Sequence, residues 1–125
     1  SRWYAQTLAR RIRGLVALRP RITFLEGDGL AYLEKTAFRR DVAYFIDPPY
    51  TAAGKSAGKR LYSYSDVDHE RLFDLCGLAK SDFMMTYDDA ASVRAMAEKH
   101  GFRIDKVPMK NTHHAQMFEL LIFPT

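Results

Sequence analysis

The sequence predicts an α/β fold in which most strands are parallel. Apolar stretches rich in β-favouring residues alternate with stretches of helical spacing along nearly all of the 125 residues, and this alternation is typical of parallel sheets joined by helices. The last two apolar stretches, 102–107 and 117–123, are separated by only a short polar turn, so they should pair antiparallel. We therefore expect one domain with a mixed sheet, mostly parallel, whose last strand is antiparallel.

Local patterns and breaker residues set the expected bounds of each element. Pro20 ends an N-terminal amphipathic helix, and Ser65 with Asp68 forms a capping box that opens another helix. Gly101 suits a helix C-terminus, and Pro108 is expected to stop the strand that follows it. Helices are expected at 2–18, 30–36, 65–79 and 90–99, and strands at 21–26, 42–46, 82–87, 102–107 and 117–123.

Composition excludes several classes of protein. Hydrophobic residues make up 47% and charged residues 27% of the chain, which fits a globular domain and not a disordered one. No run of about 18 apolar residues is present, so no transmembrane helix is expected, and no signal peptide is recognisable. The lone cysteine, Cys76, excludes an internal disulfide and is expected to pack within an apolar helical stripe. His113 and His114 have no cysteine or carboxylate cluster spaced with them, so no metal site is expected.

Positive charge is concentrated near the N-terminus. The net charge is +4 and the isoelectric point is about 9.3, and a series of arginines precedes the first acidic residue, Glu26. These arginines are Arg2, Arg10, Arg11, Arg13, Arg19 and Arg21. Two interpretations remain open, a solvated helix face and a face that contacts phosphates.

The stretch with the most chemical content is Asp47-Pro48-Pro49-Tyr50, which follows the apolar strand at 42–46. Because the prolines lack N–H groups, they end the strand, and the corner stands beyond its carboxyl end, where ligands bind in open α/β sheets. This tetrapeptide resembles the catalytic motif of S-adenosylmethionine-dependent methyltransferases that act on exocyclic amino groups of DNA bases. In that motif the Asp47 carboxylate and the Pro48 carbonyl would accept hydrogen bonds from both N–H groups of the base and aim its lone pair at the methyl donor. Pro49 would keep the carbonyl aimed, and Tyr50 would stack on an extruded base. The alternative is an ordinary proline turn.

Two nucleotide-binding motifs are incomplete in this sequence. Gly54-Lys55-Ser56 is similar to the end of a phosphate-binding P-loop, but Pro49 stands where the motif needs an earlier glycine. Gly27-Asp28-Gly29 is similar to a dinucleotide fingerprint, but the third small residue is replaced by Tyr32, which is too bulky for close packing of helix on sheet. We therefore expect neither a P-loop nor a nicotinamide site.

The order of motifs from Trp3 to Phe123 resembles the C-terminal portion of Dam-type DNA adenine methyltransferases. The tetrapeptide corner is the most specific of these motifs, and the others gain weight because they follow in the same order. The matching pieces are the arginine-rich helix, the strand ending at Gly27-Asp28, Asp47-Pro48-Pro49-Tyr50, the pairs Tyr64-Ser65 and Asp68-His69, Met85-Thr86-Tyr87-Asp88, and Phe118-Glu119-Leu120-Leu121-Ile122.

The resemblance implies a Rossmann-like methyltransferase sheet, S-adenosylmethionine as methyl donor, double-stranded DNA as partner, and a cytoplasmic, DNA-associated enzyme of a bacterium or phage. It implies cofactor contacts from Asp28, Gly29 and Asp47, although Asp28 between two glycines can equally be a turn-former. The implied catalytic residues are Asp47, Pro48, Pro49 and Tyr50. The implied DNA contacts are Lys55, Lys59 and Arg60, together with Lys110, Asn111 and His113, for which a solvated turn is the alternative.

The sequence departs from the family pattern in one respect. We find no glycine-rich Phe-x-Gly-x-Gly motif and no segment for target recognition, so the chain is expected to be the catalytic-motif portion of a methyltransferase without the first strands. The strand at 21–26 would then have no neighbour. Self-association, or pairing with an N-terminal portion through the unpaired sheet edge, is left open. Two alternatives for function also remain: methylation of cytosine, RNA or protein amino groups, and an inactive remnant that binds nucleic acid.

Overall fold

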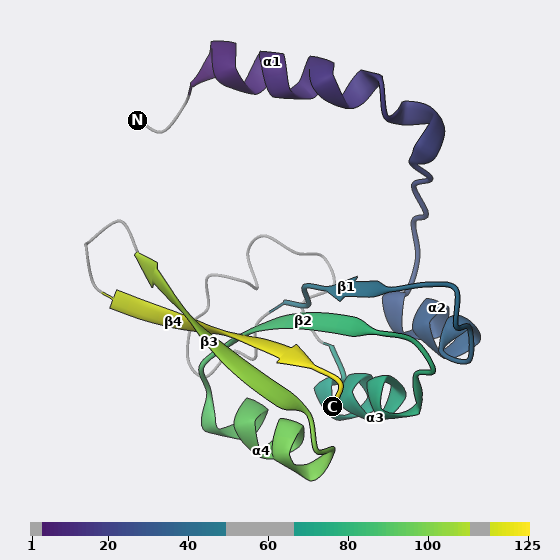
Figure 1. Ribbon diagram of the computed structural model, residues 1–125, viewed down its shortest axis with the longest axis vertical. Helices are drawn as coiled ribbons and strands as arrows, with labels where there is room; N and C mark the ends of the chain where they lie inside the picture. The colour runs from purple at the N-terminus through teal and green to yellow at the C-terminus, as the bar shows by residue number, and fades with distance from the viewer. Residues whose placement is uncertain (1–3, 50–66, 111–115) are drawn as a thin grey trace.

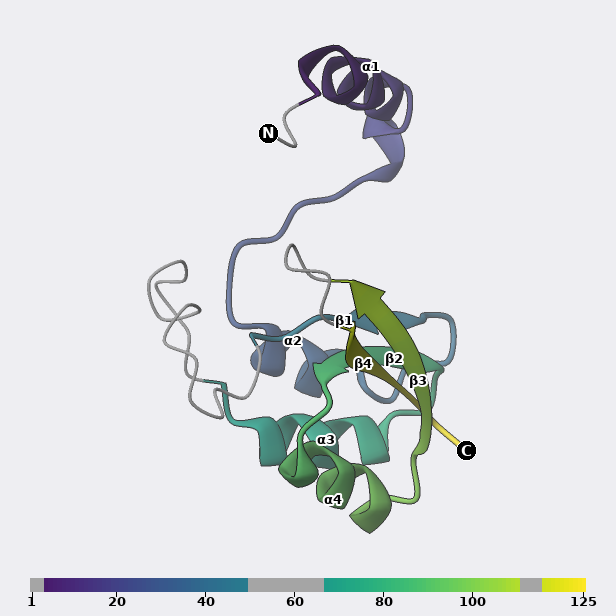
Figure 2. The same cartoon turned by 90° about the vertical axis from the view of Figure 1, so that its left-hand side faces the viewer.

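The computed structural model describes residues 4–49, 67–110 and 116–125 (Figure 1). In the described residues a four-stranded sheet is covered on one face by three helices, α2, α3 and α4, and α1 stands apart from it (Figures 1 and 2). The elements are α1 Ala5–Val16, the 3-10 helix η1 Arg19–Arg21, α2 Gly29–Thr36, β1 Tyr44–Ile46, α3 His69–Leu78, β2 Phe83–Asp88, α4 Ala91–Lys99, β3 Arg103–Lys110 and β4 Gln116–Phe123.

The sheet has the strand order β1-β2-β4-β3. β1 is parallel to β2, whereas β4 is antiparallel to both β2 and β3. Consequently β1, β2 and β3 all run the same way and only the last strand is reversed, which confirms the predicted strand directions. The expectation that neighbouring strands would mainly pair in parallel is nevertheless wrong. Because β4 is inserted between β2 and β3, only the β1–β2 ladder is parallel in the described sheet.

The core lies between one face of the sheet and the three helices that cover it. Alternate residues of β2, namely Phe83, Met85 and Tyr87, are buried, as period-2 alternation requires. Leu120 and Ile122 of β4 are buried beside them. The helices contribute Leu33 from α2, Leu72, Phe73, Leu75 and Cys76 from α3, and Val93 and Ala97 from α4.

Cys76 has the packing role that its position predicts. Its side chain is buried, and the thiol donates to the sulfur of Met85 at 3.7 Å. Burial raises the pKa of the Cys76 thiol to about 12, so the reactive thiolate is scarce at neutral pH.

The opposite face of the sheet, called the open face below, carries the other set of alternating side chains. Phe45 of β1 is 66% exposed there. Of the described α-helices only α1 lies on this side of the sheet, and it stands apart from the strands (Figure 2). Helix α1 does not cover it, because α1 has no buried residue and is joined to the sheet only through the stretch at 22–28. The apolar side of α1, including Ile12, Leu15 and Val16, is therefore exposed as well.

The predicted strand at 21–26 is wrong. Residues Arg19–Arg21 form a 3-10 turn, and residues 22–26 have no regular structure and pair with no strand in the described chain. Phe24 is 85% exposed there. A strand needs a neighbour for its N–H and C=O groups, and without one the β-favouring sequence of this stretch is not sufficient.

The ends of two other elements also differ from the prediction. α3 begins at His69, and its N-cap is Asp68, whose carboxylate accepts from the Arg71 N–H at 3.0 Å; Ser65, the predicted cap, lies outside the described residues. Pro108 does not stop its strand, because β3 continues to Lys110. β3 is an edge strand that pairs on one side only, and such a strand tolerates a proline whose nitrogen faces away from the ladder.

The remaining described elements agree with the prediction to within a few residues. α2 and α4 cover the expected residues, and the strands at 44–46, 83–88 and 116–123 lie where the apolar runs are. Gly101 follows α4 with φ of +68°, and the Phe102 N–H bonds to the Ala97 carbonyl at 2.9 Å. This geometry confirms that Gly101 ends the helix, since a left-handed residue closes the last turn and glycine adopts it without strain.

We expect Leu120→Ala to destabilise the fold by about 2–5 kcal/mol, because Leu120 is fully buried and its removal leaves a cavity. Urea unfolding followed by circular dichroism measures the change. Leu78→Ala is the matched control, because Leu78 is 69% exposed and its removal should change the free energy of unfolding by less than about 0.5 kcal/mol. An equal loss of unfolding free energy in the two variants would contradict the assignment of Leu120 to the core.

Candidate active site

The carboxyl ends of β1 and β2 share one edge of the sheet with the N-termini of α2 and α3. α2 ends beside the start of these strands, since the Ala37 carbonyl accepts from the Lys80 N–H at 2.7 Å and the Tyr44 hydroxyl donates to Thr36 Oγ1 at 2.9 Å. α2 therefore begins on the side toward which β1 points. α3 begins on the same side, because His69 contacts Tyr87 near the end of β2.

Asp47 stands at this edge, directly after the last residue of β1. Its carboxylate is exposed, and its Oδ1 accepts a hydrogen bond from Thr86 Oγ1 at 2.5 Å. Pro48 and Pro49 follow and are half-buried. The strand ends where the prolines begin, as the sequence predicts, and the Asp47 carboxylate is presented at the carboxyl edge.

Asp28 has a structural role that the geometry explains. It is the N-cap of α2, and its Oδ1 accepts from the Leu30 N–H at 2.9 Å, which satisfies one of the unpaired donors at the helix start. Gly29 is the first residue of α2. Asp28 does not follow a strand, but the start of α2 still brings it to the same edge as Asp47.

A contact between His69 and Tyr87 joins the start of α3 to β2, on the face of the sheet that the helices cover. His69 Nδ1 lies 2.8 Å from the Tyr87 hydroxyl, and the two rings meet edge to face with centroids 5.6 Å apart. Burial raises the pKa of the Tyr87 hydroxyl well above its usual range, so the phenol stays neutral at neutral pH. This contact gives His69 a structural role at the start of α3.

Asp89, just after β2, is the centre of a three-residue charge cluster. Its carboxylate pairs with Arg94 of α4 at 2.7 Å and with Lys106 of β3 at 3.0 Å. The hydrogen bond from Arg94, followed by that from Lys106, lowers the pKa of Asp89 from 3.8 to about 2. The cluster links the end of β2 to α4 and to β3.

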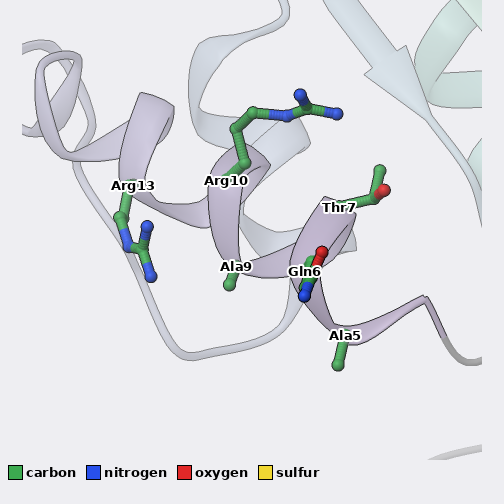
Figure 3. A pocket seen from close by; sticks show the side chains of 6 residues that line it. All are labelled: Ala5, Gln6, Thr7, Ala9, Arg10 and Arg13. Atoms are coloured by element: carbon green, nitrogen blue, oxygen red, sulfur yellow. The ribbon is translucent and has the colours of Figure 1, made fainter.

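Two hollows in the described chain are lined by residues other than Asp28, Asp47 and Thr86. One is a shallow groove along α1, lined by side chains that include Arg10 and Arg13 (Figure 3). Another lies beside α3 and α4, between Glu70, Met96 and His100. Among the described residues no three His, Cys, Asp or Glu side chains are grouped so that they could hold a metal ion. No helix in that same part of the chain is long and apolar enough to cross a membrane.

Several residues predicted to act at the site cannot be placed. Tyr50, Lys55, Lys59, Arg60, Asn111 and His113 all lie outside the described residues. Lys110 is the last residue of β3. Gly54-Lys55-Ser56 and the pair His113-His114 also fall outside, so the structure does not test the interpretations made of them.

Thr86 is the residue at this edge to which the sequence analysis gave no role. It occurs in the matched stretch Met85-Thr86-Tyr87-Asp88, but no local pattern relates it to Asp47, which is 39 positions away. The signal that could have found it is the parallel pairing of two strands whose carboxyl ends both carry polar residues.

Comparison with known proteins adds no identification. The sequence matches no protein-family model, and it matches no curated protein. The geometry of the carboxyl edge and the chemistry of its residues are therefore what indicate a function.

We expect Asp89→Asn to lower the melting temperature at neutral pH, because the charge cluster loses its only carboxylate. The folded-state pKa of Asp89 is depressed, so its stabilising effect is present above the ordinary pKa and is lost as the pH falls through the lower one. The difference in melting temperature between wild type and variant should shrink as the pH falls from about 4 to about 2. Calorimetry over this range checks it, and a difference independent of pH would contradict the assignment.

Proposed function

We propose that this chain carries the catalytic corner of an enzyme that transfers a methyl group from S-adenosylmethionine to the exocyclic amino group of adenine in double-stranded DNA. The observation that carries the proposal is the exposed Asp47 carboxylate, which follows a parallel strand, precedes two prolines and is held on one side by Thr86. A hydrogen-bond acceptor fixed at the carboxyl end of a parallel strand is placed where α/β proteins bind ligands.

The corner can activate an amino group without a covalent intermediate. The nitrogen of adenine is a poor nucleophile because its lone pair is delocalised into the ring. The free oxygen of Asp47 and the carbonyl of Pro48 can each accept a hydrogen bond from one N–H group of the base. Two such hydrogen bonds favour a tetrahedral nitrogen with its lone pair directed at the methyl group. Acceptors that are already in place cost no reorganisation during the reaction. Tyr50 follows in the sequence and would stack on the flipped base.

The donor set suits the amino-bearing parts of S-adenosylmethionine. That molecule supplies a methyl group on a positively charged sulfur. Asp28, at the start of α2, uses one oxygen to cap the helix, and its second oxygen can accept from the adenine amino group of the cofactor. The carboxylates of Asp28 and Asp47 are thus the groups that would hold it, and neither lines the groove along α1 or the hollow beside α3 and α4.

The strand directions are compatible with the proposal. Three strands run one way and the last strand is reversed and inserted. These directions are the ones that the resemblance to Dam-type methyltransferases implies, although only the β1–β2 ladder is parallel in the described sheet. This agreement concerns the fold class, and the proposed reaction depends on the corner itself.

The charge on α1 and η1 supports nucleic acid as the substrate. The five described arginines of these elements are exposed, and none of them forms an ion pair with another described residue. Elsewhere four of the five described arginines are paired with carboxylates, and Arg40 is the exception. The pairs are Arg39 with Asp41, Arg71 with Glu34, Arg94 with Asp89, and Arg103 with Asp105. Unpaired guanidinium groups on one element are suited to a row of phosphates.

We expect Asp47→Asn to reduce methyl transfer at least about 100-fold, because removing one preorganised polar group from a reacting centre typically costs that much. The assay measures labelled methyl transfer to unmethylated duplex DNA, followed by digestion to nucleosides to identify the modified base. Asp41→Asn is the control, because Asp41 pairs with Arg39 before β1 and should keep wild-type activity. Absence of label with wild-type protein would contradict the proposal, and label confined to RNA, cytosine or protein would change the acceptor.

Replacing Arg10, Arg11 and Arg13 together by glutamine should weaken DNA binding and its salt dependence. Each lost phosphate contact reduces the slope of log K against log salt by about 0.9. Fluorescence anisotropy with one duplex at several salt concentrations measures that slope. Arg39→Gln combined with Arg71→Gln is the matched control, since both arginines are already ion-paired. An unchanged slope for the triple variant would show that α1 does not contact phosphates.

A further inference from the structure

The contact between Thr86 and Asp47 is short and involves a charged acceptor. The Thr86 hydroxyl donates to Asp47 Oδ1 at 2.5 Å, which is within the range of about 2.5–2.7 Å for a hydroxyl bound to a carboxylate. Hydrogen bonds of this kind are about twice as strong as neutral ones. No other hydrogen bond to the Asp47 side chain is seen among the described residues, so Thr86 is the group that holds it.

The parallel ladder puts these two residues together. Ile46 pairs with Met85, so the residues that follow them, Asp47 and Thr86, stand at the same level of the sheet. Tyr44 and Ile46 pack against the core while Phe45 is exposed, so alternation places Asp47 on the open face. The same alternation places Thr86 there, between buried Met85 and Tyr87.

Thr86 is well suited to hold a carboxylate in one orientation. Its backbone is held in the sheet, since Thr86 is opposite Leu121 of β4 and the preceding residue, Met85, pairs with Ile46 of β1. A β-branched side chain has few χ1 rotamers, so the direction of the hydroxyl is restricted. The exposed carboxylate of Asp47 would otherwise rotate among several rotamers, because nothing else in the described chain contacts it by hydrogen bonding.

We propose that Thr86 is a positioning residue that locks the Asp47 carboxylate in one rotamer, with one oxygen engaged and the other directed at the amino group of the substrate. The role in catalysis rests on the proposed function, whereas the rotamer lock does not. Because Thr86 engages one oxygen of Asp47, the other oxygen remains as an acceptor. Together with the Pro48 carbonyl it provides two acceptors for the two N–H groups of the substrate amino group. Thr86 touches neither substrate nor methyl donor in this scheme and acts through Asp47.

The rotamer lock can be tested without any enzymatic activity. Three-bond NMR couplings from the Asp47 Cγ to its backbone nitrogen and carbonyl carbon report the χ1 population. Wild type and Thr86→Ser should show a single rotamer, and Thr86→Val should show averaged couplings, because valine keeps the shape and loses the hydroxyl. Thr36→Val is the matched control, because the Thr36 hydroxyl bonds to Tyr44 and the Tyr32 carbonyl and not to Asp47. Unchanged couplings in Thr86→Val overturn the proposal.

Kinetics test the catalytic consequence. Thr86→Val should lower kcat about 10- to 100-fold, the size of loss that follows when a reacting group is misplaced, with KM values for DNA and S-adenosylmethionine within about twofold of wild type. Thr86→Ser should restore kcat. An active wild type with an equally active Thr86→Val variant overturns the positioning role. A wild type without methyl transfer contradicts the proposed function instead, and the couplings of Asp47 then still decide whether Thr86 holds it.

Discussion

The parallel ladder between β1 and β2 is the constraint on which the candidate site depends. Only three pairs of residues form it, from Tyr44 with Phe83 to Ile46 with Met85. A shift of one residue would turn Thr86 to the covered face and bring Tyr87, whose hydroxyl already bonds to His69, to the open face. The burial of Phe83, Met85 and Tyr87 fixes the register of β2, so the packing of the core determines the geometry at the edge.

The charged side chains are used differently in the two parts of the molecule. At the carboxyl edge Asp28 and Asp68 cap helices, and Asp89 pairs with two cations. These contacts stabilise the fold. Asp47 differs from Asp89 because its partner is a neutral hydroxyl, which leaves its charge uncompensated among the described residues. The arginines of α1 are similarly uncompensated within the described chain. The Asp47 carboxylate at the edge of the sheet is therefore an available hydrogen-bond acceptor, and the arginines of α1 are available hydrogen-bond donors.

Elements that depend on local sequence could be predicted, and features that depend on a partner strand could not. The N-cap at Asp28 and the glycine at 101 are decided within one turn of helix, so α2 and α4 lie where the sequence places them. Residues 21–26 have strand-like sequence, but no neighbour is present to accept their hydrogen bonds. Pro108 remains in β3 because that strand lies at an edge.

The candidate site follows the same division. The position of Asp47 after an apolar strand and before two prolines is visible in the sequence, and the structure places it at the carboxyl edge of β1. The contact with Thr86 depends on which strands are neighbours and in which register, and neither is encoded within a short window. Long-range pairing is therefore the information that the sequence alone did not supply, both for the sheet order and for the residue that holds the carboxylate.

The prolines at the edges of the sheet have a consequence for how copies of the chain meet. A strand edge with free N–H groups is a template on which another chain can extend the sheet, and such edges lead to fibres. In the described sheet β1 has only three residues and is followed by Pro48 and Pro49, and the opposite edge strand, β3, contains Pro108. Neither edge offers a long row of donors. The two prolines that shape the corner beside Asp47 thus also protect the chain from edge-to-edge aggregation.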